Sequence, residues 1–287
     1  MLPGKALRYP LRQGVASMQG HQGGQPRGDG RPVHAMLRTR DEVLISAIHL
    51  PGDRDLALVV AHGFTGSWRQ QRVQRVMGGL REFGGIIAGD FRGHGRSSGS
   101  CTMGMSEIED LSATVGWARS LGYRRVVTVG FSMGACIAVR HAALQADVAP
   151  VDAVVAVSGP AFWYYRGTPI MRGVHRLVES PTGRFAMHAR GVRISSAGWP
   201  DPPPMSPVEA AARIVDIPFL VVHGTVDRYF PLDHARALHR AASTSGNAFA
   251  DLWVIPDFGH AERAISPETL GDLGQWVRKS VGLSMLP

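Results

Sequence analysis

The chain of 287 residues is long enough for one large α/β domain or two small ones, and its hydrophobic fraction of 44% is that of an ordinary globular protein. No apolar run approaches the roughly 18 residues of a membrane span, and no apolar stretch follows the basic residues near the N-terminus, so neither a membrane span nor a secretory signal is predicted. With only two cysteines, Cys101 and Cys136, a disulfide framework is not expected, which favours a cytoplasmic protein.

The net charge of +8 invites a nucleic-acid-binding interpretation, which the distribution of the charge weakens. Residues 1–40 hold seven basic side chains and one acid, which leaves 24 basic and 22 acidic residues for the rest of the chain. Only two of the 31 basic residues are lysines, so the excess of arginine indicates a compositional bias rather than a phosphate-binding surface. We expect no nucleic-acid partner; a role carried by the basic tail is the alternative.

The predicted elements follow a polar tail. Residues 1–32 are rich in Gly, Gln, Pro and Arg, cannot bury apolar surface, and are predicted to be disordered. Strands are predicted at 33–38, 43–50, 56–61, 85–89, 126–129, 153–157, 219–223 and 249–255, and helices at about 67–83, 106–121, 135–144 and 233–242 and from 266 onward. Buried apolar strands that alternate with helices predict an α/β fold, with a mostly parallel sheet and helices on both faces.

Three helix starts carry capping signals. Ser67 and Ser106 each precede a Gln or Glu three residues later, which predicts two capping boxes. Ser266, followed by proline, predicts the N-cap of the last helix.

One segment interrupts the alternation, because no strand pattern occurs between residues 157 and 219. A long insertion in a compact α/β domain is usually functional. We therefore expect an α/β core of residues 33–158 and 207–287, with residues 159–206 as a cap or lid. Its aromatic residues Trp163, Tyr164 and Trp199 are candidates for substrate binding.

The most informative motif is Gly130-Phe131-Ser132-Met133-Gly134, set between a predicted strand and a predicted helix. Gly-x-Ser-x-Gly at such a junction is the pattern of a nucleophile elbow. The turn is so tight that the residues two positions away must lack side chains, and the strained serine holds its hydroxyl clear of the backbone. The pentapeptide alone arises by chance in a chain with 35 glycines, so its placement after four apolar residues carries the interpretation. Ser132 is the candidate nucleophile.

A serine nucleophile needs a base, and the base needs a third group that orients it. His260 follows the last predicted strand and Asp227 follows the one before it, in the chain order Ser, Asp, His. Asp257 is a weaker candidate for the acid, since it lies only three residues from His260 and an awkward reversal would be needed. The sequence therefore predicts a triad of Ser132, Asp227 and His260.

The oxyanion of such a reaction requires preorganised donors. The backbone N–H of Met133, at the start of the elbow helix, is one candidate. The N–H of Phe64, in the glycine-containing loop after the strand 56–61, is the other. His62 and His223, which both precede a glycine at a strand end, are expected to shape their loops through local hydrogen bonds.

With these motifs, residues 33–280 resemble the α/β-hydrolase family. The resemblance is carried by the segment 62–66, by the elbow, by the loops of Asp227 and His260, and by Asp90-Phe91-Arg92-Gly93-His94-Gly95-Arg96-Ser97. The last block is similar to one in the carboxylesterase, monoacylglycerol lipase and serine aminopeptidase branch. The resemblance implies that Asp90 and Arg92 tie loops beneath the site. Serine at 132 argues against the branches that use aspartate or cysteine.

The implied activity is that of a serine hydrolase acting on small-molecule acyl esters through an acyl-enzyme, without a metal or organic cofactor. A thioesterase, an acyltransferase, a peptidase and a cofactor-free haloperoxidase or perhydrolase would use the same triad, and the sequence does not separate them. A non-catalytic, ligand-binding member of the fold is the alternative from a different class. Oligomeric state leaves no trace in the sequence.

Overall fold

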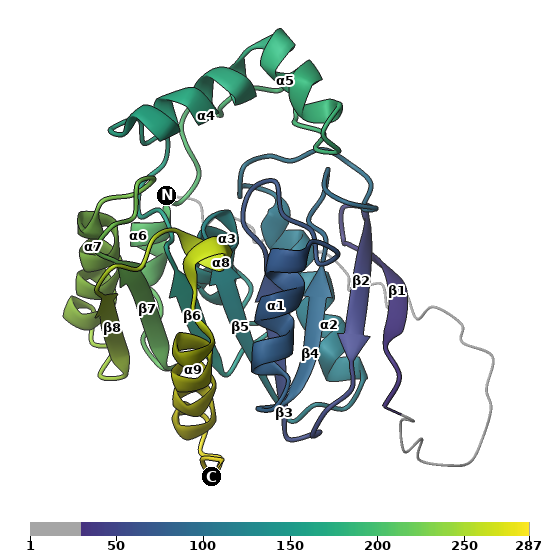
Figure 1. Ribbon diagram of the computed structural model, residues 1–287, viewed down its shortest axis with the longest axis vertical. Coiled ribbons are helices and arrows are strands. Elements are labelled where there is room, and N and C mark those ends of the chain that lie inside the picture. The colour runs from purple at the N-terminus through teal and green to yellow at the C-terminus, as the bar shows by residue number, and fades with distance from the viewer. Residues whose placement is uncertain (1–29, 287) are drawn as a thin grey trace, which may run out of the picture.

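The computed structural model describes residues 30–286, so the prediction for the tail at 1–32 falls almost wholly outside the described residues. Within that range an eight-stranded sheet forms the centre of the molecule (Figure 1). Its strands are β1 (Val33–Arg38), β2 (Leu44–Leu50), β3 (Leu56–Ala61), β4 (Gly85–Gly89), β5 (Arg125–Phe131), β6 (Ala153–Val157), β7 (Phe219–Gly224) and β8 (Ala250–Ile255). All eight predicted strands are confirmed to within about two residues at either end.

The strand order is β1-β2-β4-β3-β5-β6-β7-β8. The pairs of β2 with β1 and with β4 are antiparallel, and every other pair is parallel. The sheet is therefore mostly parallel, as expected. The carboxyl ends of β3, β5, β6, β7 and β8 consequently meet at one edge, where loops can bring distant side chains together.

Helices cover both faces of the sheet. The face with α2 (Glu107–Ser120), α3 (Met133–Leu144), α6 (Pro207–Ala211) and α7 (Leu232–Thr244) encloses one core, and the face with α1 (Gln71–Leu80) and α9 (Pro267–Ser280) encloses the other. Alternate residues of β3 serve the two cores: Val59 points to the first and Leu58 to the second. Burial on both faces explains why the central strands are apolar throughout.

The predicted helix caps have mixed outcomes. Ser266 accepts a hydrogen bond from the Thr269 amide, with Pro267 in the first turn, as predicted. The two capping boxes are wrong. The first helix begins later, at Gln71, without a side-chain cap. The Ser106 side chain accepts no cap hydrogen bond at the start of α2, and the Glu109 carboxylate pairs with Arg40 instead.

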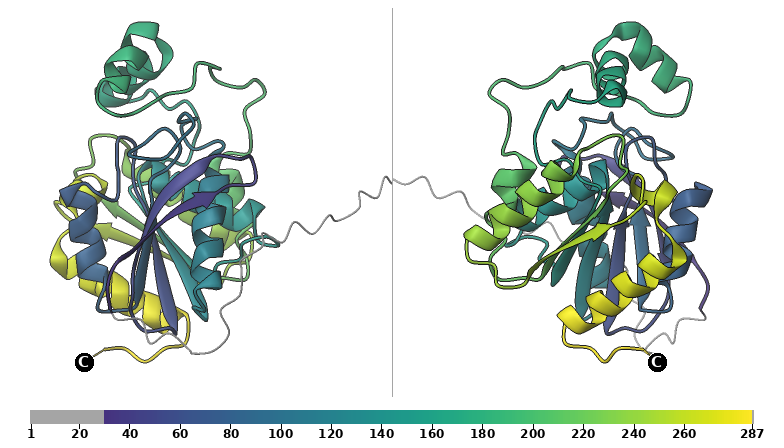
Figure 2. Two further views of the ribbon diagram at one scale, coloured as in Figure 1. Left: turned by 90° about the vertical axis from the view of Figure 1, so that its right-hand side faces the viewer. Right: turned by 60° about the vertical axis from the view of Figure 1, so that its left-hand side comes forward.

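Residues 159–206, which we call the upper segment, lie above the carboxyl edge of the sheet (Figures 1 and 2). They contain α4 (Pro169–Glu179) and α5 (Pro181–His188), and no strand. The short helix α8 (Ala261–Ala264) follows β8 at the same edge. No helix among residues 30–286 is both long and apolar enough to cross a bilayer.

Candidate active site

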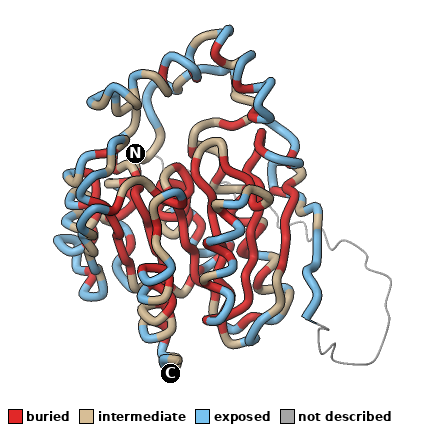
Figure 3. The backbone as a smooth tube through the Cα atoms, in the orientation of Figure 1, coloured by how far each residue is buried: buried red, intermediate tan, exposed pale blue. Residues whose placement is uncertain are grey.

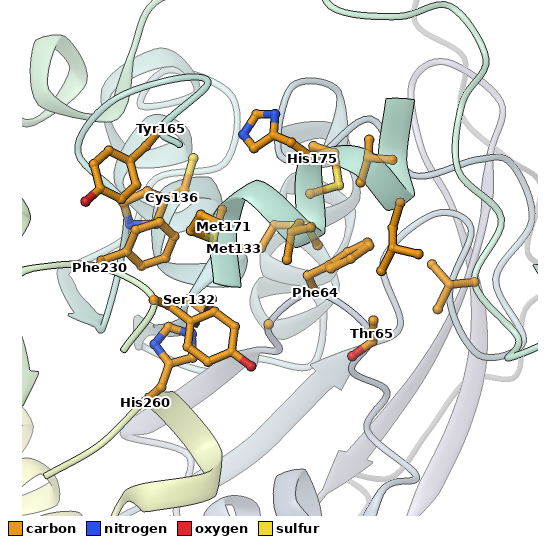
Figure 4. Close-up of a pocket in the computed structure, with 18 of the residues that line it drawn as sticks. Phe64, Thr65, Ser132, Met133, Cys136, Tyr165, Met171, His175, Phe230 and His260 are labelled. Atoms are coloured by element: carbon orange, nitrogen blue, oxygen red, sulfur yellow. Dashed lines mark hydrogen bonds between the residues drawn. The ribbon is translucent and has the colours of Figure 1, made fainter. Parts of the chain in front are cut away.

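Ser132 occupies the turn between β5 and α3, with φ 52° and ψ −114°. A side chain at Gly134 would collide with the Ala61 carbonyl, and one at Gly130 would collide with the Gly134 carbonyl. Only glycine fits at these two positions, which is the steric requirement that the motif predicts. The Ser132 side chain is half-buried and faces a cavity (Figure 4).

The three predicted residues lie in one hydrogen-bonded chain. His260 Nε2 is 2.9 Å from Ser132 Oγ, and His260 Nδ1 is 2.7 Å from Asp227 Oδ2. Since the carboxylate accepts at Nδ1, the Nδ1 nitrogen carries the proton and Nε2 is free to accept from the serine hydroxyl. Residues separated by 128 positions in the sequence are thus aligned for proton transfer.

Asp227 is fully buried and its two carboxylate oxygens have different partners. Oδ1 accepts from the amides of Tyr229 and Phe230, at 2.8 and 3.2 Å, and Oδ2 accepts from His260. Burial disfavours the charged carboxylate, but the hydrogen bond and the charge of His260 and the two amides outweigh burial, and they lower the pKa of Asp227. The acid is therefore held as an anion in a fixed orientation.

The His260 loop has two supports that the sequence patterns did not reveal. The ring of Tyr229 stacks on the imidazole, with 4.1 Å between centroids and 19° between planes. The amide of Ala261 donates to the hydroxyl of Ser158, which is buried at the end of β6. Ser158 thus anchors the loop that carries His260.

The loop of residues 62–66 lies beside Ser132, and His62 fixes its shape. The Phe91 amide donates to His62 Nε2 at 3.0 Å, so Nδ1 is the protonated nitrogen and donates to the Gly63 carbonyl at 2.8 Å. Burial lowers the pKa of His62 to about 3, so the ring is neutral. His223 donates from Nε2 to the Phe230 carbonyl at 2.9 Å. Both histidines shape loops, as predicted.

Glu262 is a further polar residue at this site, and no motif pointed to it. Its side chain is buried, and Oε1 accepts from the Gly63 amide at 2.6 Å. A Cβ atom placed on Gly63 would lie 3.4 Å from that oxygen and 3.2 Å from the Ser132 Cβ atom, so the carboxylate and the serine flank the same glycine. Glu262 thereby connects the loop of His260 to the loop that contains Phe64.

A cavity of about 350 Å³ opens above the serine (Figure 4). Its floor contains Ser132, Met133 and His260, and its wall includes Phe64 and residues of α4. Cys136 also lines the cavity, and burial raises the pKa of its thiol to about 12, so the thiol is protonated at neutral pH.

The aromatic residues predicted to bind substrate all line this cavity. Trp163 Nε1 donates to the Pro204 carbonyl at 2.7 Å, and the Tyr164 hydroxyl donates to the Pro200 carbonyl at 3.0 Å. Trp199 Nε1 donates to Glu179 at 2.7 Å. The N–H or O–H group of each ring thus donates to an acceptor within the upper segment. The apolar faces of the rings are therefore the parts available to a ligand.

A family model described as "alpha/beta hydrolase fold" matches residues 57–171. The chain also superposes on an esterase of Pyrococcus furiosus with a TM-score of 0.70 and 23% identity, over 88% of this chain and 92% of that one. The chain has the α/β-hydrolase fold.

Two further solved structures share this fold. Est1E from Butyrivibrio proteoclasticus, with ferulic acid bound, gives a TM-score of 0.59 at 18% identity, over 86% of this chain and all of that one. A serine hydrolase without a lid from Xanthomonas campestris gives 0.56 at 18% identity, over 92% of this chain and all of that one. No curated protein matches the chain.

In this α/β-hydrolase fold the Asp90–Ser97 block lies beneath the site and ties loops together. Asp90 accepts from the Trp68 amide and from the Arg69 guanidinium, at 2.9 and 2.8 Å. Arg92 pairs with Asp41 and Asp110, and these ion pairs outweigh burial and raise its pKa. Asp90 and Arg92 thus each connect loops, and each does so through its own partners. Among residues 30–286, no three His, Cys, Asp or Glu side chains form a cluster that could hold a metal ion.

Proposed function

We propose that the protein is a serine hydrolase that cleaves carboxylic esters of small molecules through an acyl-enzyme intermediate. The observation that carries the proposal is the hydrogen-bonded chain from Asp227 through His260 to Ser132, which ends in a cavity beside the serine hydroxyl. The esterases among the structures of the same fold support the reaction class.

In the first half of the reaction, Ser132 Oγ attacks the ester carbonyl carbon while His260 Nε2 takes the hydroxyl proton. Asp227 stabilises the imidazolium that forms, and its lowered pKa is in keeping with this role. The tetrahedral intermediate collapses as the C–O bond to the alcohol breaks and His260 returns the proton to the leaving oxygen. The acyl group stays on Ser132.

We assign the binding of the substrate oxyanion to the backbone amides of Phe64 and Met133. Among residues 30–286, no acceptor is hydrogen-bonded to either amide, so both are free to donate to a substrate. Met133 begins α3, where the helix dipole adds a favourable field. The Gly63 amide has a different task, since it already donates to Glu262.

In the second half a water molecule replaces the alcohol. His260 takes one proton from this water, the hydroxide attacks the acyl carbon, and the carboxylic acid leaves as Ser132 regains its proton. The proposed steps need only side chains and amides of this chain.

We further propose that residues 159–206 act as a cap that shapes the substrate cavity. Trp163, Tyr164 and Trp199 line the cavity with apolar ring faces and would contact an aliphatic or aromatic group of the substrate. The upper segment would thus select the substrate, while the sheet edge beneath it performs the chemistry.

The test uses p-nitrophenyl butyrate and a fluorophosphonate probe. We expect Ser132→Ala to lower kcat/KM by about 10⁵-fold or more, since the nucleophile and its base act as a unit. The probe should label Ser132 in the wild-type protein, by mass spectrometry of the modified peptide, and should still label the variant Cys136→Ala. Undiminished turnover by Ser132→Ala, with its circular dichroism unchanged, would refute the proposal.

A further inference from the structure

A second cavity, of about 560 Å³, lies next to the one above Ser132. It is formed between the loop of residues 101–106 and residues 194–204 of the upper segment. Three residues, Met103, Val178 and Trp199, line both cavities and therefore form the partition between them. The second cavity thus adjoins the proposed active site, with three side chains between the two.

The partition is built from side chains that can make way for a ligand. Met103 is unbranched and adapts its shape readily. Trp199 is held at its edge by the hydrogen bond to Glu179, and its ring stands 4.9 Å from that of Tyr164 and 5.4 Å from that of His175. Trp199 is only half-buried, so close packing does not enclose it on every side.

The first cavity is too small for a long ester. A cavity of about 150 Å³ holds benzene, so 350 Å³ accommodates on the order of 14 heavy atoms. A p-nitrophenyl group with a short acyl chain already reaches that limit. A longer acyl chain extends beyond the first cavity, and the partition is the boundary that this cavity shares with the second one.

The lining of the second cavity favours an uncharged chain. Apolar residues dominate it, including Met105, Ile194 and Pro202. Its two charged side chains are already engaged: Glu179 accepts from Trp199 and His175, and Arg184 donates to the carbonyls of Val178 and Glu179.

We propose that the second cavity binds the distal end of an unbranched acyl chain whose ester group lies at Ser132. The chain passes the partition between Met103 and Trp199. This inference rests on the proposed function and narrows its substrate class to esters with extended, flexible acyl groups. Each methylene that enters an apolar cavity contributes to binding, so occupancy of the second cavity should appear as a preference for longer chains.

The test compares p-nitrophenyl esters of butyric and dodecanoic acid. Ala197 lines only the second cavity, and Ala197→Trp would fill that cavity. We expect this variant to lower the ratio of kcat/KM for the long ester to that for the short ester by at least tenfold. The neighbouring exposed residue Ser196 lines neither cavity, so Ser196→Trp is the matched control and should leave the ratio within about twofold.

A second variant acts from the other side of the partition. Trp199→Ala opens it and should raise the same ratio severalfold, which keeps the test informative if Ala197→Trp does not fold. Equal effects of Ala197→Trp on both esters, or an unchanged ratio in both variants, would overturn the inference while the proposed function stands.

A protein that hydrolyses neither ester would contradict the proposed function instead. In that case calorimetry of dodecanoate binding to the variant Ser132→Ala tests whether the second cavity holds the chain. The double variant Ser132→Ala/Ala197→Trp should bind dodecanoate at least tenfold more weakly, and equal affinities of the single and double variants would overturn the inference.

Discussion

The edge of the sheet and the upper segment differ in how they are held. Every residue of β3, β4, β6 and β7 is buried, whereas α4 buries only His175 and Val178 and α5 only Gly183 and Met187 (Figure 3). The loops at the sheet edge are further fixed by buried polar contacts, of which the bond between Glu262 and Gly63 is an example. The upper segment instead presents exposed apolar side chains such as Phe185.

This difference separates two tasks. Proton transfer requires atoms held to within a fraction of an ångström, which dense packing and fixed hydrogen bonds provide. Selection among substrates of different length requires a wall that can adjust, and weakly buried helices carry such a wall.

The largest effect should come from the fixed edge. Asp227→Asn would present an amide N–H to His260 and favour the wrong tautomer, so kcat for p-nitrophenyl butyrate should fall by about 10⁴-fold. Steady-state kinetics measures the fall, and circular dichroism checks the fold. Asp257→Asn is the matched control, since Asp257 is close to His260 in sequence and makes no side-chain hydrogen bond to it in the structure. A comparable loss of kcat in Asp257→Asn would contradict the assignment of Asp227 as the acid of the triad.

The next effect concerns stability and compares one phenylalanine from each region. Phe219 in β7 is fully buried, and Phe219→Ala should lower the free energy of unfolding by about 3–5 kcal/mol. Phe185 in α5 is 75% exposed, and Phe185→Ala should change it by no more than about 0.5 kcal/mol. Urea unfolding measures both. A large loss in Phe185→Ala would mean that the upper segment is packed as firmly as the core.

Most strands of the sheet could be predicted from the sequence because a buried strand appears as a run of apolar residues. A strand such as β3, apolar on both faces, can be predicted without knowledge of its neighbours. The proximity of Ser132, Asp227 and His260 could be predicted because each follows a predicted strand, and parallel strands end at the same edge. The geometry now places these side chains in hydrogen-bond contact.

Contacts between distant loops left no such trace. Glu262 reaches Gly63 across 199 positions, and neither residue stands in a periodic pattern that would indicate the contact. The helices α4 and α5 of the upper segment were not among the predicted elements, although α4 is strongly amphipathic. Their starts did carry a signal, since Thr168 and Ser180 each precede a proline and each caps its helix.

A moderate effect is expected at Glu262, which contacts the proposed oxyanion loop and not the reacting atoms. Glu262→Ala removes the acceptor of the Gly63 amide, so the Phe64 amide loses its orientation and kcat should fall by about 10–100-fold with KM little changed. Glu262→Gln keeps an acceptor oxygen and should restore kcat to within about threefold of the wild type. Equal losses in both variants would show that the charge matters rather than the hydrogen bond.

The smallest effect tests the same contrast through pH, with one histidine from each region. His141 in α3 is fully buried, neither ring nitrogen has a hydrogen-bond partner, and burial lowers its pKa to about 4. The unfolded chain, with a histidine pKa of about 6.5, binds the proton more readily, so the stability from the neutral ring is complete above that pH and is lost as pH falls toward 4. Between pH 7 and 5, His141→Leu should therefore lose about 1–2 kcal/mol less unfolding free energy than the wild type, as measured by urea titration at each pH. His188 in α5 is exposed, and His188→Leu should change the free energy of unfolding at pH 7 by no more than about 0.5 kcal/mol. If His141→Leu kept the wild-type dependence of stability on pH, the buried ring would be taking up its proton in the folded state, and the sheet-facing helices would be more open to water than their burial indicates.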